Sequence, residues 1–338
     1  MRAAYIETHG GPEVLKIGEL KEPEIKEGYV KIRVKACSVN HLDLWVRRGI
    51  PNLRIEYPHI LGSDISGIIE EISDEEIPFK KGDKVILYPA TFCGRCENCI
   101  SGKENLCKEY KILGENTNGG NAEFIVIKKE LLMPYPENLS FEEAASIPLT
   151  LLTAMQMVEK SNVKPMDTAL VMAAGSGVSV MLIQILKAMN VYVITTSSKE
   201  EKLKKAKELG ADELINYAEE GWEKKLKGRK IDVIFDHTGK NFLPSLLKIV
   251  KWGGKIVTCG ATSGHDANID LRYIFFKQIE LIGSTMGARR HLLKGLELVR
   301  KGKVKPFVHT VLPLEEIRKA HELLEERKVF GKVVLKVN

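Results

Sequence analysis

The feature that most constrains the fold is an alternation of short apolar runs and amphipathic stretches between residues 168 and 284. The apolar runs are TALVMAA, NVYVITT, IDVIF, GKIVTCG and IELIGS. Stretches with helical periodicity separate them, among them residues 199–209 and 242–250. Strands that alternate with helices form βαβ units, in which the strands run parallel and the helices cover the sheet. The pattern therefore predicts an α/β domain built on a parallel sheet.

The part of the chain before residue 132 has a different pattern, in which short β-branched runs are separated by turn residues. Examples are YVKIRVKAC, ISGIIEEI and DKVILYP, and they predict a β-rich first domain. Near Ser140 the sequence changes to FEEAASIPLTLLTAMQMVEK, a helix opened by a capping serine, and we expect the domain crossover here. The amphipathic helix predicted over 314–327 and the final strand GKVVLKV are expected to return to the first domain.

Composition limits the class of protein. The chain has 338 residues, 44% hydrophobic and 28% charged, which is enough for about two domains. Its net charge of +6 comes from interleaved lysine and glutamate, not from a basic block, so nucleic acid is not an expected partner. The start MRAAYIETHG has no apolar signal region, and Gln184, Lys187 and Asn190 interrupt the longest apolar stretch. We therefore expect a cytoplasmic protein with no membrane span.

Clustered cysteines indicate a metal site. Four of the six cysteines follow the spacing C-x2-C-x2-C-x7-C, at Cys93, Cys96, Cys99 and Cys107. Four thiolates satisfy a tetrahedral zinc ion and leave no open position, which is typical of a structural site. The alternatives are two disulfides, which a reducing cytosol disfavours, and an iron–sulfur cluster. The isolated Cys37 and Cys259 are interpreted as buried small hydrophobic residues.

A candidate nucleotide-binding turn follows the first strand of the alternating region. TALVMAA leads into AGSGVSV and the helix-like MLIQILKAM, the context in which a helix N-terminus binds a pyrophosphate. The dinucleotide pattern G-x-G-x-x-G falls on Ala174, Gly175, Ser176, Gly177, Val178 and Ser179. Small residues replace the three expected glycines. On this pattern alone, a dinucleotide site and an ordinary βα turn both stay open.

The end of the next strand bears on which dinucleotide is bound. The residues there that offer hydroxyl or ammonium groups are Ser197, Ser198, Lys199 and Lys202. In NAD sites an acidic residue about twenty residues after the turn binds the ribose, and the strand end here carries none. Hydroxyl and ammonium groups suit the 2′-phosphate of NADP(H) instead. The alternative is that the lysines only form a solvated helix face.

Taken in order, these motifs resemble the medium-chain alcohol dehydrogenase and quinone oxidoreductase superfamily over essentially the whole chain. The segments are GGPEVLKI, KACSVNHLDLWVRRG, PHILGSDISG, GDKVILYP, the four-cysteine loop, EEAASIPLTLLTA, the βα turn, ELGADELINY, DHTG, GGKIVTCG and GKVVLKV. The resemblance implies a GroES-like catalytic domain over residues 1–140 and 287–338. It implies a Rossmann domain, with a doubly wound parallel sheet, over residues 141–286. It further implies an NAD(P)-dependent oxidoreductase that forms a homodimer or homotetramer.

The resemblance also implies cofactor contacts. Ser198, Lys202 and Tyr217 would surround the adenosine 2′-phosphate, in agreement with the charge argument above. The residues implied to lie near the nicotinamide are Thr153, Gly260, Ala261, Ser284 and Met286.

The catalytic zinc ligands of the zinc-dependent members are missing. Those enzymes use a cysteine in the first active-site loop, a histidine in a Gly-His-Glu motif, and a cysteine or acid before the nucleotide domain. The matching positions here are Asn40, Ser63 followed by Asp64, and Leu149. The hydroxyl that relays the alcohol proton is replaced by Leu42. Zinc polarisation of an alcoholate therefore lacks its usual ligands.

Asn40 is similar to the residue that zinc-free quinone and enone reductases carry in this loop, where hydrogen-bond donors polarise a conjugated carbonyl. We therefore predict Asn40 as a catalytic residue. Its neighbour His41 is a candidate proton donor, with a packed or surface histidine as the alternative. Asp43 is expected to orient its neighbours. A relocated metal site of His41, His59 and Asp64 is a further alternative, although the spacing fits no zinc pattern.

Three functions are consistent with these residues. The first is an NADP(H)-dependent oxidoreductase that transfers hydride to a quinone, enone or related small carbonyl compound, with one structural zinc per chain. The second is an alcohol dehydrogenase with an unconventional catalytic zinc, since the cysteine loop is more typical of that group. The third is a non-catalytic NADPH-binding protein. The first two differ in metal content, at about one and about two zinc ions per chain.

Overall fold

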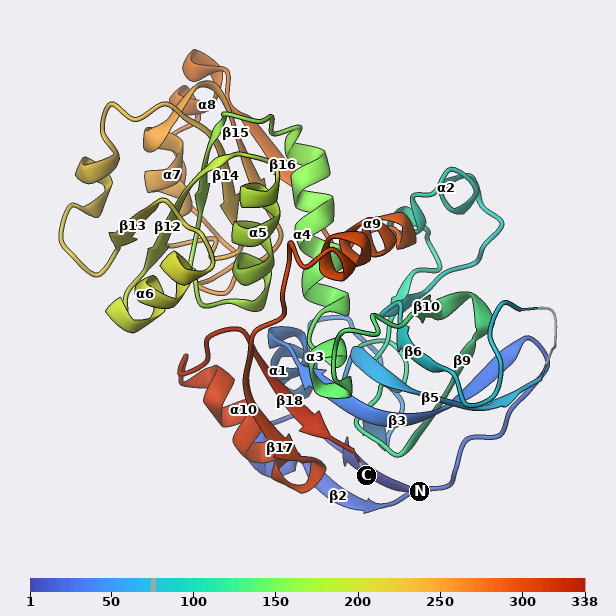
Figure 1. Cartoon of the computed structure of the whole chain (residues 1–338). Coiled ribbons are helices and arrows are strands. Elements are labelled where there is room, and N and C mark those ends of the chain that lie inside the picture. Colours follow the sequence, from blue (N-terminus) through green and yellow to red (C-terminus); the bar gives the residue numbers. More distant parts are fainter. Residues whose placement is uncertain (74–76, 338) are drawn as a thin grey trace. The chain divides into compact units, whose positions relative to one another are not determined.

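The computed structural model describes residues 1–73 and 77–337, and within them the chain forms two compact units (Figure 1). The first unit comprises Met1–Leu149 and Pro306–Asn338, and the second comprises Thr150–Lys305. The boundaries predicted from the sequence lie after residue 140 and before residue 287. In the structure they lie further along the chain, because α3 (Phe141–Ala145) packs within the first unit and α9 (Arg289–Arg300) packs within the second.

The main sheet of the first unit has the strand order β10-β6-β5-β3-β18-β17, with β9 also paired to β3. Its strands are β3 Tyr29–Val39, β5 Asp64–Ile72, β6 Lys84–Leu87, β9 Phe124–Lys128, β10 Leu132–Pro134, β17 Val308–Pro313 and β18 Lys332–Lys336. β18 is antiparallel to β3, with Val334 opposite Ser38, and β17 is parallel to β18. The C-terminal segment therefore supplies two strands to a sheet that the N-terminal segment begins, as Figure 1 shows.

Shorter elements complete the first unit. A second sheet has the order β2-β1-β4, and β7 pairs with β8. These strands are β1 Arg2–Ile6, β2 Lys16–Glu19, β4 His59–Ile60, β7 Ala90–Thr91 and β8 Lys111–Ile112. The helices are α1 His41–Arg48, α2 Glu97–Ile100, α3 Phe141–Ala145 and α10 Ile317–Glu325. The 3₁₀ turns are η1 Pro12–Val14, η2 Glu104–Leu106, η3 Lys129–Leu131 and η5 Leu314–Glu316.

The second unit contains the parallel sheet predicted from the alternating pattern. The strand order is β13-β12-β11-β14-β15-β16, and every pairing is parallel. The strands are β11 Thr168–Val171, β12 Tyr192–Ser197, β13 Glu213–Asn216, β14 Ile231–Asp236, β15 Val250–Thr258 and β16 Glu280–Gly283. The strand order reverses between β11 and β14, and doubly wound sheets bind ligands at that point, beyond the carboxyl ends of the strands.

Helices cover this sheet (Figure 1). The helices of this unit are α4 Pro148–Ser161, α5 Gly177–Ala188, α6 Glu200–Glu208, α7 Leu243–Ile249, α8 Leu271–Lys277 and α9 Arg289–Arg300, with the 3₁₀ turn η4 Trp222–Leu226. Among them, α9 packs on α4 and does not cover the sheet. Helix α9 lies in the second unit because Gly295 allows close contact with α4. An added Cβ at Gly295 would lie 2.6 Å from Cγ of Leu151. No helix in residues 1–73 or 77–337 is both long and apolar enough to cross a membrane.

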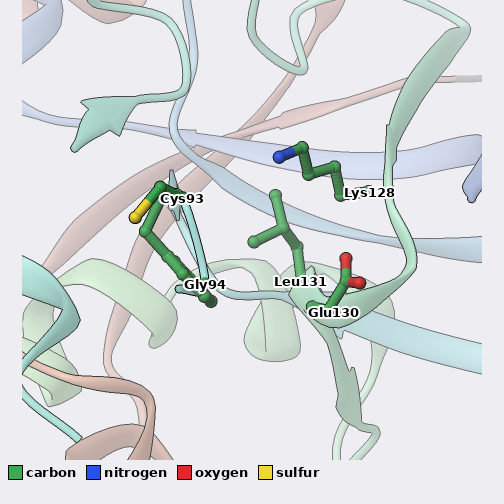
Figure 2. Close-up of a pocket in the computed structure, with 6 residues that line it drawn as sticks. Cys93, Gly94, Lys128, Glu130 and Leu131 are labelled. Atoms are coloured by element: carbon green, nitrogen blue, oxygen red, sulfur yellow. The ribbon is translucent and has the colours of Figure 1, made fainter. Parts of the chain in front are cut away.

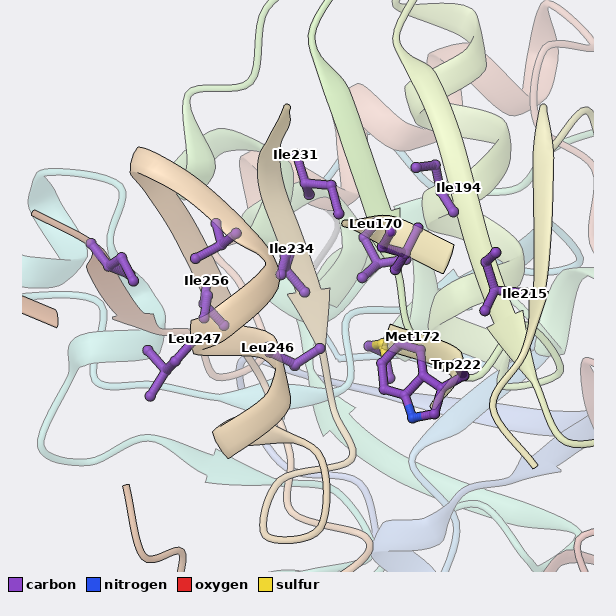
Figure 3. Packing of buried hydrophobic residues seen from close by; sticks show 13 residues of the cluster. Leu170, Met172, Ile194, Ile215, Trp222, Ile231, Ile234, Leu246, Leu247 and Ile256 are labelled. Atoms are coloured by element: carbon purple, nitrogen blue, oxygen red, sulfur yellow. The ribbon is translucent and has the colours of Figure 1, made fainter. Parts of the chain in front are cut away.

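The core of the second unit explains why its strands read as continuous apolar runs. Figure 3 shows the buried side chains that meet there. Across the sheet, successive strands contribute Ile215, Ile194, Leu170, Ile234 and Ile256. Trp222 of η4 and Leu246 of α7 pack into the same cluster. Parallel strands are covered on both faces, so they lack the polar alternation of half-exposed strands.

The helix predicted after Ser140 is interrupted. Ser140 caps α3 as expected, because its Oγ accepts a hydrogen bond from the backbone N–H of Glu143 at 3.2 Å. The helix then ends at Ala145, and α4 begins at Pro148. Proline lacks an N–H and disfavours helical geometry in the preceding residue, so it opens a new helix more easily than it continues one. Within the first unit, Ala145 packs against Ala36 and Val334.

A buried arginine connects α1 to α10 in the first unit. Arg47 is fully buried, and its Nη1 donates to Nδ1 of His321 at 3.1 Å. Its Nε donates to the carbonyl of Gly10 at 3.1 Å, and its Nη2 pairs with Glu325. The contacts require a neutral imidazole with an unprotonated Nδ1. The stability of the first unit should therefore depend on pH.

Lowering the pH is expected to destabilise the protein through His321. Burial, helped by the charges of Arg47 and Arg48, lowers the pKa of His321 from 6.5 to about 3. Below pH 6.5 His321 binds a proton in the unfolded chain but not in the folded one. Its contribution to the free energy of unfolding is therefore fully present above pH 6.5 and is lost as the pH falls towards 3. At pH 5 the loss should be about 2 kcal/mol. Urea unfolding at pH 7 and pH 5 measures this difference in the free energy of unfolding. Between these pH values His321→Asn should lose less stability than the wild type. Equal losses would contradict the assignment.

Candidate functional site

The four clustered cysteines form one site in the first unit. Their sulfur atoms all lie within 4.8 Å of one another. Sγ of Cys99 is 3.5 Å from that of Cys96 and 3.8 Å from that of Cys93. Sulfurs bound to one zinc ion at about 2.3 Å lie about 3.8 Å apart, whereas a disulfide needs about 2.05 Å. The arrangement fits a tetrahedral metal ion and does not contain the alternative disulfides.

The thiols of the loop differ in how easily they ionise. Burial raises the pKa of Cys99 to about 12. Hydrogen bonds from the backbone N–H groups of Arg95 and Cys96 lower the pKa of Cys93 to about 6. Four adjacent thiolates repel one another unless a metal ion compensates their charge. The donor set therefore fits zinc, and it would hold the ion in a closed site.

A small cavity lies beside the cysteine loop (Figure 2). It is lined by Phe92, Cys93, Gly94, Lys128, Glu130 and Leu131, and its volume is about 80 Å³. Pockets for drug-sized ligands have volumes of about 300–1,000 Å³. Figure 2 shows the sulfur of Cys93 on the side away from Lys128 and Leu131. The cavity is too small for a dinucleotide and does not represent the substrate site.

The predicted dinucleotide turn lies directly after β11, at the point where the strand order reverses. Ser176 is the N-cap of α5, and its Oγ accepts a hydrogen bond from the backbone N–H of Ser179 at 3.0 Å. Ala174 is buried and donates its N–H to the carbonyl of Thr196 at 2.7 Å. Gly177 and Val178 form the start of the helix. The first N–H groups of a helix lack helical partners and attract anions, so this end of α5 fits a pyrophosphate.

One residue at this turn was not predicted as a site residue. His237 follows β14, and its Nε2 lies 2.8 Å from Oγ of Ser176 and 3.1 Å from Oγ of Ser179. Burial lowers its pKa, which keeps the ring neutral. In the sequence, DHTG contributes only to the family resemblance. The signal that points to His237 is its position at the end of β14, which adjoins β11 at the reversal of strand order.

The residues predicted around the 2′-phosphate gather at the end of β12. Tyr217 donates its backbone N–H to the carbonyl of Ser197 at 3.0 Å. Ser197 is buried, whereas Ser198 is exposed. The side chain of Lys202 lies over Gly175, where an added Cβ would be 2.7 Å from its Cδ and 3.2 Å from its Nζ. The structure therefore brings the predicted ammonium group to the turn itself.

An acidic residue does lie near this corner. Glu200 begins α6, and its carboxylate accepts a hydrogen bond from Nδ2 of Asn216 at 2.8 Å. Lys199 donates its backbone N–H to Oγ of Ser197 at 3.2 Å. Asn216 pairs with Ser197 in the sheet, so the Glu200 carboxylate adjoins the strand end that also presents the hydroxyl groups of Ser197 and Ser198.

The residues predicted near the nicotinamide lie beyond β15 and β16 and on α4. Gln156, one turn after Thr153, donates to the carbonyl of Thr285 at 3.2 Å. Ser284 donates its N–H to the carbonyl of Thr258 at 2.8 Å. Its hydroxyl is buried and has no hydrogen-bond partner within the described chain. Such a group needs a partner, and the nicotinamide carboxamide can supply one.

The remaining predicted residues on this side are Gly260, Ala261 and Met286. Gly260 and Ala261 follow the end of β15. A side chain at Gly260 would lie 3.2 Å from the carbonyl of His237. Met286 is buried and has a φ of 51°. These positions are all in the second unit, at the carboxyl end of its sheet.

In the first unit, Asn40 lies between β3 and α1. Its backbone N–H donates to Oδ2 of Asp43 at 2.7 Å. Oδ1 of Asp43 accepts from the backbone N–H of Gly62 at 2.9 Å. Burial raises the pKa of Asp43 to about 6. Asp43 thus fixes the start of α1 to the segment around Gly62.

The side chain of Asn40 belongs to a buried polar cluster centred on Asp64. Oδ2 of Asp64 accepts from Oγ of Ser38 at 3.1 Å, Nδ2 of Asn40 at 2.9 Å and Nζ of Lys332 at 2.9 Å. Its Oδ1 accepts from the backbone N–H of Leu149 at 2.6 Å. Asp64 is completely buried, and the side chain of Lys332 is 5% exposed. The sequence analysis did not identify Lys332, which lies in the final strand.

The family resemblance aligns Asn40, Ser63 and Leu149 with the catalytic zinc ligands of zinc-dependent members, and the groups at these three positions do not fit a metal. Leu149 offers only its backbone, and Ser63 donates its hydroxyl to the carbonyl of Leu113 at 2.7 Å. The carboxylate of Asp64 is already neutralised by an ammonium group. Within residues 1–73 and 77–337, the cysteine loop is the only cluster of His, Cys, Asp or Glu that could hold a metal.

The alternative site of His41, His59 and Asp64 does not form. His41 is exposed, and its ring lies 6.5 Å from that of Trp45. His59 is buried, with Nε2 3.1 Å from the carbonyl of Gly114. Asp64 is bound to Lys332. The three side chains therefore have separate partners.

Comparison with known proteins agrees with these two units. Residues 26–137 match the alcohol dehydrogenase GroES-like domain, and residues 177–301 match the zinc-binding dehydrogenase family. A crystal structure of an NAD-dependent alcohol dehydrogenase is 46% identical, with a TM-score of 0.97 and complete coverage of both chains. The NAD-dependent alcohol dehydrogenase of Sulfolobus acidocaldarius is 33% identical, also with complete coverage of both. The quinone oxidoreductase of Mus musculus is 29% identical and covers 99% of this chain and 97% of its own.

The chain therefore belongs to the zinc-type medium-chain dehydrogenase/reductase superfamily. Within it, the relatives are NAD(P)-dependent alcohol dehydrogenases and quinone oxidoreductases, and the chain is an oxidoreductase of this kind. The family and the fold class predicted from the sequence are confirmed, and the prediction of a non-catalytic protein is not supported.

Proposed function

We propose that the protein is an NADP(H)-dependent reductase that transfers hydride to a quinone, an enone or a related conjugated carbonyl compound. The observation that carries this proposal is the cluster of Asn40, Asp64 and Lys332 in place of catalytic zinc ligands. An amide N–H can polarise a carbonyl oxygen without a metal. One structural zinc ion per chain would occupy the cysteine loop, which suits a cytoplasm that keeps thiols reduced.

The reaction needs little acid–base chemistry from the protein. Bound NADPH would supply a hydride to the β-carbon of the enone, and the displaced π electrons would move onto the carbonyl oxygen. Asn40 donates a hydrogen bond to that oxygen as its negative charge develops. A proton then reaches the α-carbon from solvent or from the exposed His41. An imidazole can carry out such a transfer near neutral pH.

The cofactor preference rests on Ser198 and Lys202. A 2′-phosphate carries about −1.5 to −2 charges at neutral pH, by analogy with other phosphomonoesters. The exposed hydroxyl of Ser198 and the ammonium of Lys202 beside Gly175 would bind it. The relatives named above as NAD-dependent make the choice of dinucleotide a direct test of this assignment.

A second candidate function is alcohol dehydrogenase activity towards aldehydes or ketones. The complete cysteine loop and the similarity to an NAD-dependent alcohol dehydrogenase favour it. That activity would need a catalytic zinc held by ligands other than those described above.

Elemental analysis of protein purified without added metal separates the two functions, together with NADPH oxidation assays on a quinone, an enone and an aldehyde. We expect about one zinc per chain and turnover of the quinone or enone. About two zinc ions per chain, with aldehyde reduction that a chelator abolishes, would replace the first function with the second.

We also propose that the protein associates with a second copy of itself along β16. This strand lies at the edge of the sheet, so its outer backbone groups need partners. The exposed apolar side chains near this edge are Leu281 on β16 and Leu271, Phe275 and Phe276 on α8. A two-fold axis beside an edge strand pairs it with its own copy.

Leu281→Lys is expected to convert the assembly to monomers, because a charged side chain on an edge strand opposes pairing. Sedimentation velocity measures this against the chain mass of 37.9 kDa. Leu293→Lys makes the same change at a similarly exposed leucine on α9 and serves as the control. A monomeric wild type, or an unchanged Leu281→Lys variant, would remove β16 as the interface.

A further inference from the structure

The side chains of Asn40, Asp64 and Lys332 form a closed ring of hydrogen bonds. The ammonium of Lys332 donates to Oδ1 of Asn40 and to Oδ2 of Asp64. Nδ2 of Asn40 donates to the same Oδ2 of Asp64. Each of the three side chains is at least nine-tenths buried. The ring joins β3, β5 and β18, whose register the sheet fixes.

This ring determines which way the amide of Asn40 points. Oδ1 must face Lys332, because an ammonium only donates hydrogen bonds. Nδ2 must face Asp64, because a carboxylate only accepts them. An amide nitrogen carries two N–H groups, and Asp64 receives one of them. The second N–H is thereby fixed in direction, and the ring makes no use of it.

Lys332 also changes the strength of that donor. A positive charge on the amide oxygen draws electron density from the nitrogen, and hydrogen bonds in such chains strengthen one another. Asp64 neutralises the lysine charge, which makes the buried ammonium tolerable. A buried ion pair adds little stability compared with apolar packing, so stability alone does not explain its presence at this position.

We propose that Lys332 is a positioning residue that acts through Asn40: it holds the amide in one orientation and polarises its outward N–H towards the carbonyl oxygen of the substrate. This inference rests on the proposed reductase function. In the zinc-dependent relatives a metal ion supplies the positive charge. Here the charge comes from the final strand and reaches the substrate oxygen through the amide group.

Kinetics of single and double variants test this proposal. Lys332→Met should lower kcat for an enone by about 100-fold, comparable with the loss of an oxyanion-stabilising donor. The Kd for NADPH, measured by fluorescence without turnover, should not change. Asn40→Ala should lower kcat by a similar factor. Adding Lys332→Met to Asn40→Ala should cause no further decrease, because Lys332 acts through the amide.

A second measurement does not depend on activity. In the dead-end complex with NADP⁺ and an enone, the infrared carbonyl stretch of the bound enone should lie at a lower frequency than in water. The frequency should rise in both Asn40→Ala and Lys332→Met. A residue with a purely structural role would leave this frequency unchanged.

Lys332→Met leaves Asp64 buried without its partner, and the variant can fail to fold. The double variant Asp64→Asn/Lys332→Met removes both charges and should fold, and it should show the same loss of kcat. Lys336→Met, which removes an exposed lysine from the same strand, is the control and should behave as the wild type.

The outcomes separate the two proposals. A wild type that reduces no quinone or enone would overturn the proposed function. A wild type that reduces them, with Lys332 variants of unchanged kcat and carbonyl frequency, would overturn the role of Lys332 alone. Losses that multiply in the double variant with Asn40→Ala would likewise show that Lys332 does not act through the amide.

Discussion

Lys202→Glu is expected to raise the Kd for NADPH by about 100-fold and to leave the Kd for NADH almost unchanged. The substitution replaces a charge-assisted hydrogen bond with repulsion of the 2′-phosphate, a change of about 3 kcal/mol, and each 1.4 kcal/mol corresponds to about a factor of ten in affinity. NADH lacks this phosphate. Fluorescence titration of both cofactors measures the two constants on the same protein.

Lys204→Glu is the matched control for this prediction. Lys204 lies on the same helix, α6, and is exposed to solvent. Lys204→Glu changes the net charge by the same amount as Lys202→Glu, so any general electrostatic effect on cofactor binding appears in both variants. If Lys202→Glu weakens NADPH and NADH equally, the phosphate does not bind at Lys202. Ser198→Asp should then also fail to discriminate between them.

Cys99→Ser is expected to abolish zinc binding and to lower the unfolding midpoint by about 10 °C. Loss of a structural metal belongs to the changes that cost more than about 4 kcal/mol, and in a unit of this size each kcal/mol moves the midpoint by about 2–4 °C. Elemental analysis gives the zinc content, and calorimetry gives the midpoint.

Cys259→Ala provides the comparison, because Cys259 lies in the second unit whereas the cysteine loop belongs to the first. This variant should retain one zinc ion. If Cys99→Ser retains both its metal and its midpoint, the loop does not hold a structural zinc.

The features predicted well from the sequence are those in which nearby residues determine the structure. The four cysteines from Cys93 to Cys107 lie on one loop, so their spacing predicts the cluster. The alternation of strands and helices after residue 168 predicts the parallel sheet. The turn at Gly175 and the cap at Ser140 are equally local. Such features depend on backbone geometry over a few residues, which the sequence displays directly.

Features that depend on pairing between distant segments could not be predicted in the same way. Lys332 reaches Asn40 only because β18 pairs with β3. Nothing near GKVVLKV distinguishes this lysine from a solvated one, since its burial comes from the sheet. His237 is a similar case, because adjacent strands bring it to Ser176. The domain boundaries also depended on packing, such as that of Gly295 against Leu151.

The return of the C-terminal strand to the N-terminal sheet has a consequence for synthesis of the protein. β18 is translated after every other strand described here, and until it emerges β3 lacks this neighbour in the sheet. The second unit is complete in sequence before that point and can fold while translation continues. Until β18 is translated, Asp64 lacks the ammonium group of Lys332. The strand that completes this sheet thus also completes the polar cluster, and a chain truncated before Lys332 would lack both a strand and the residue that orients Asn40.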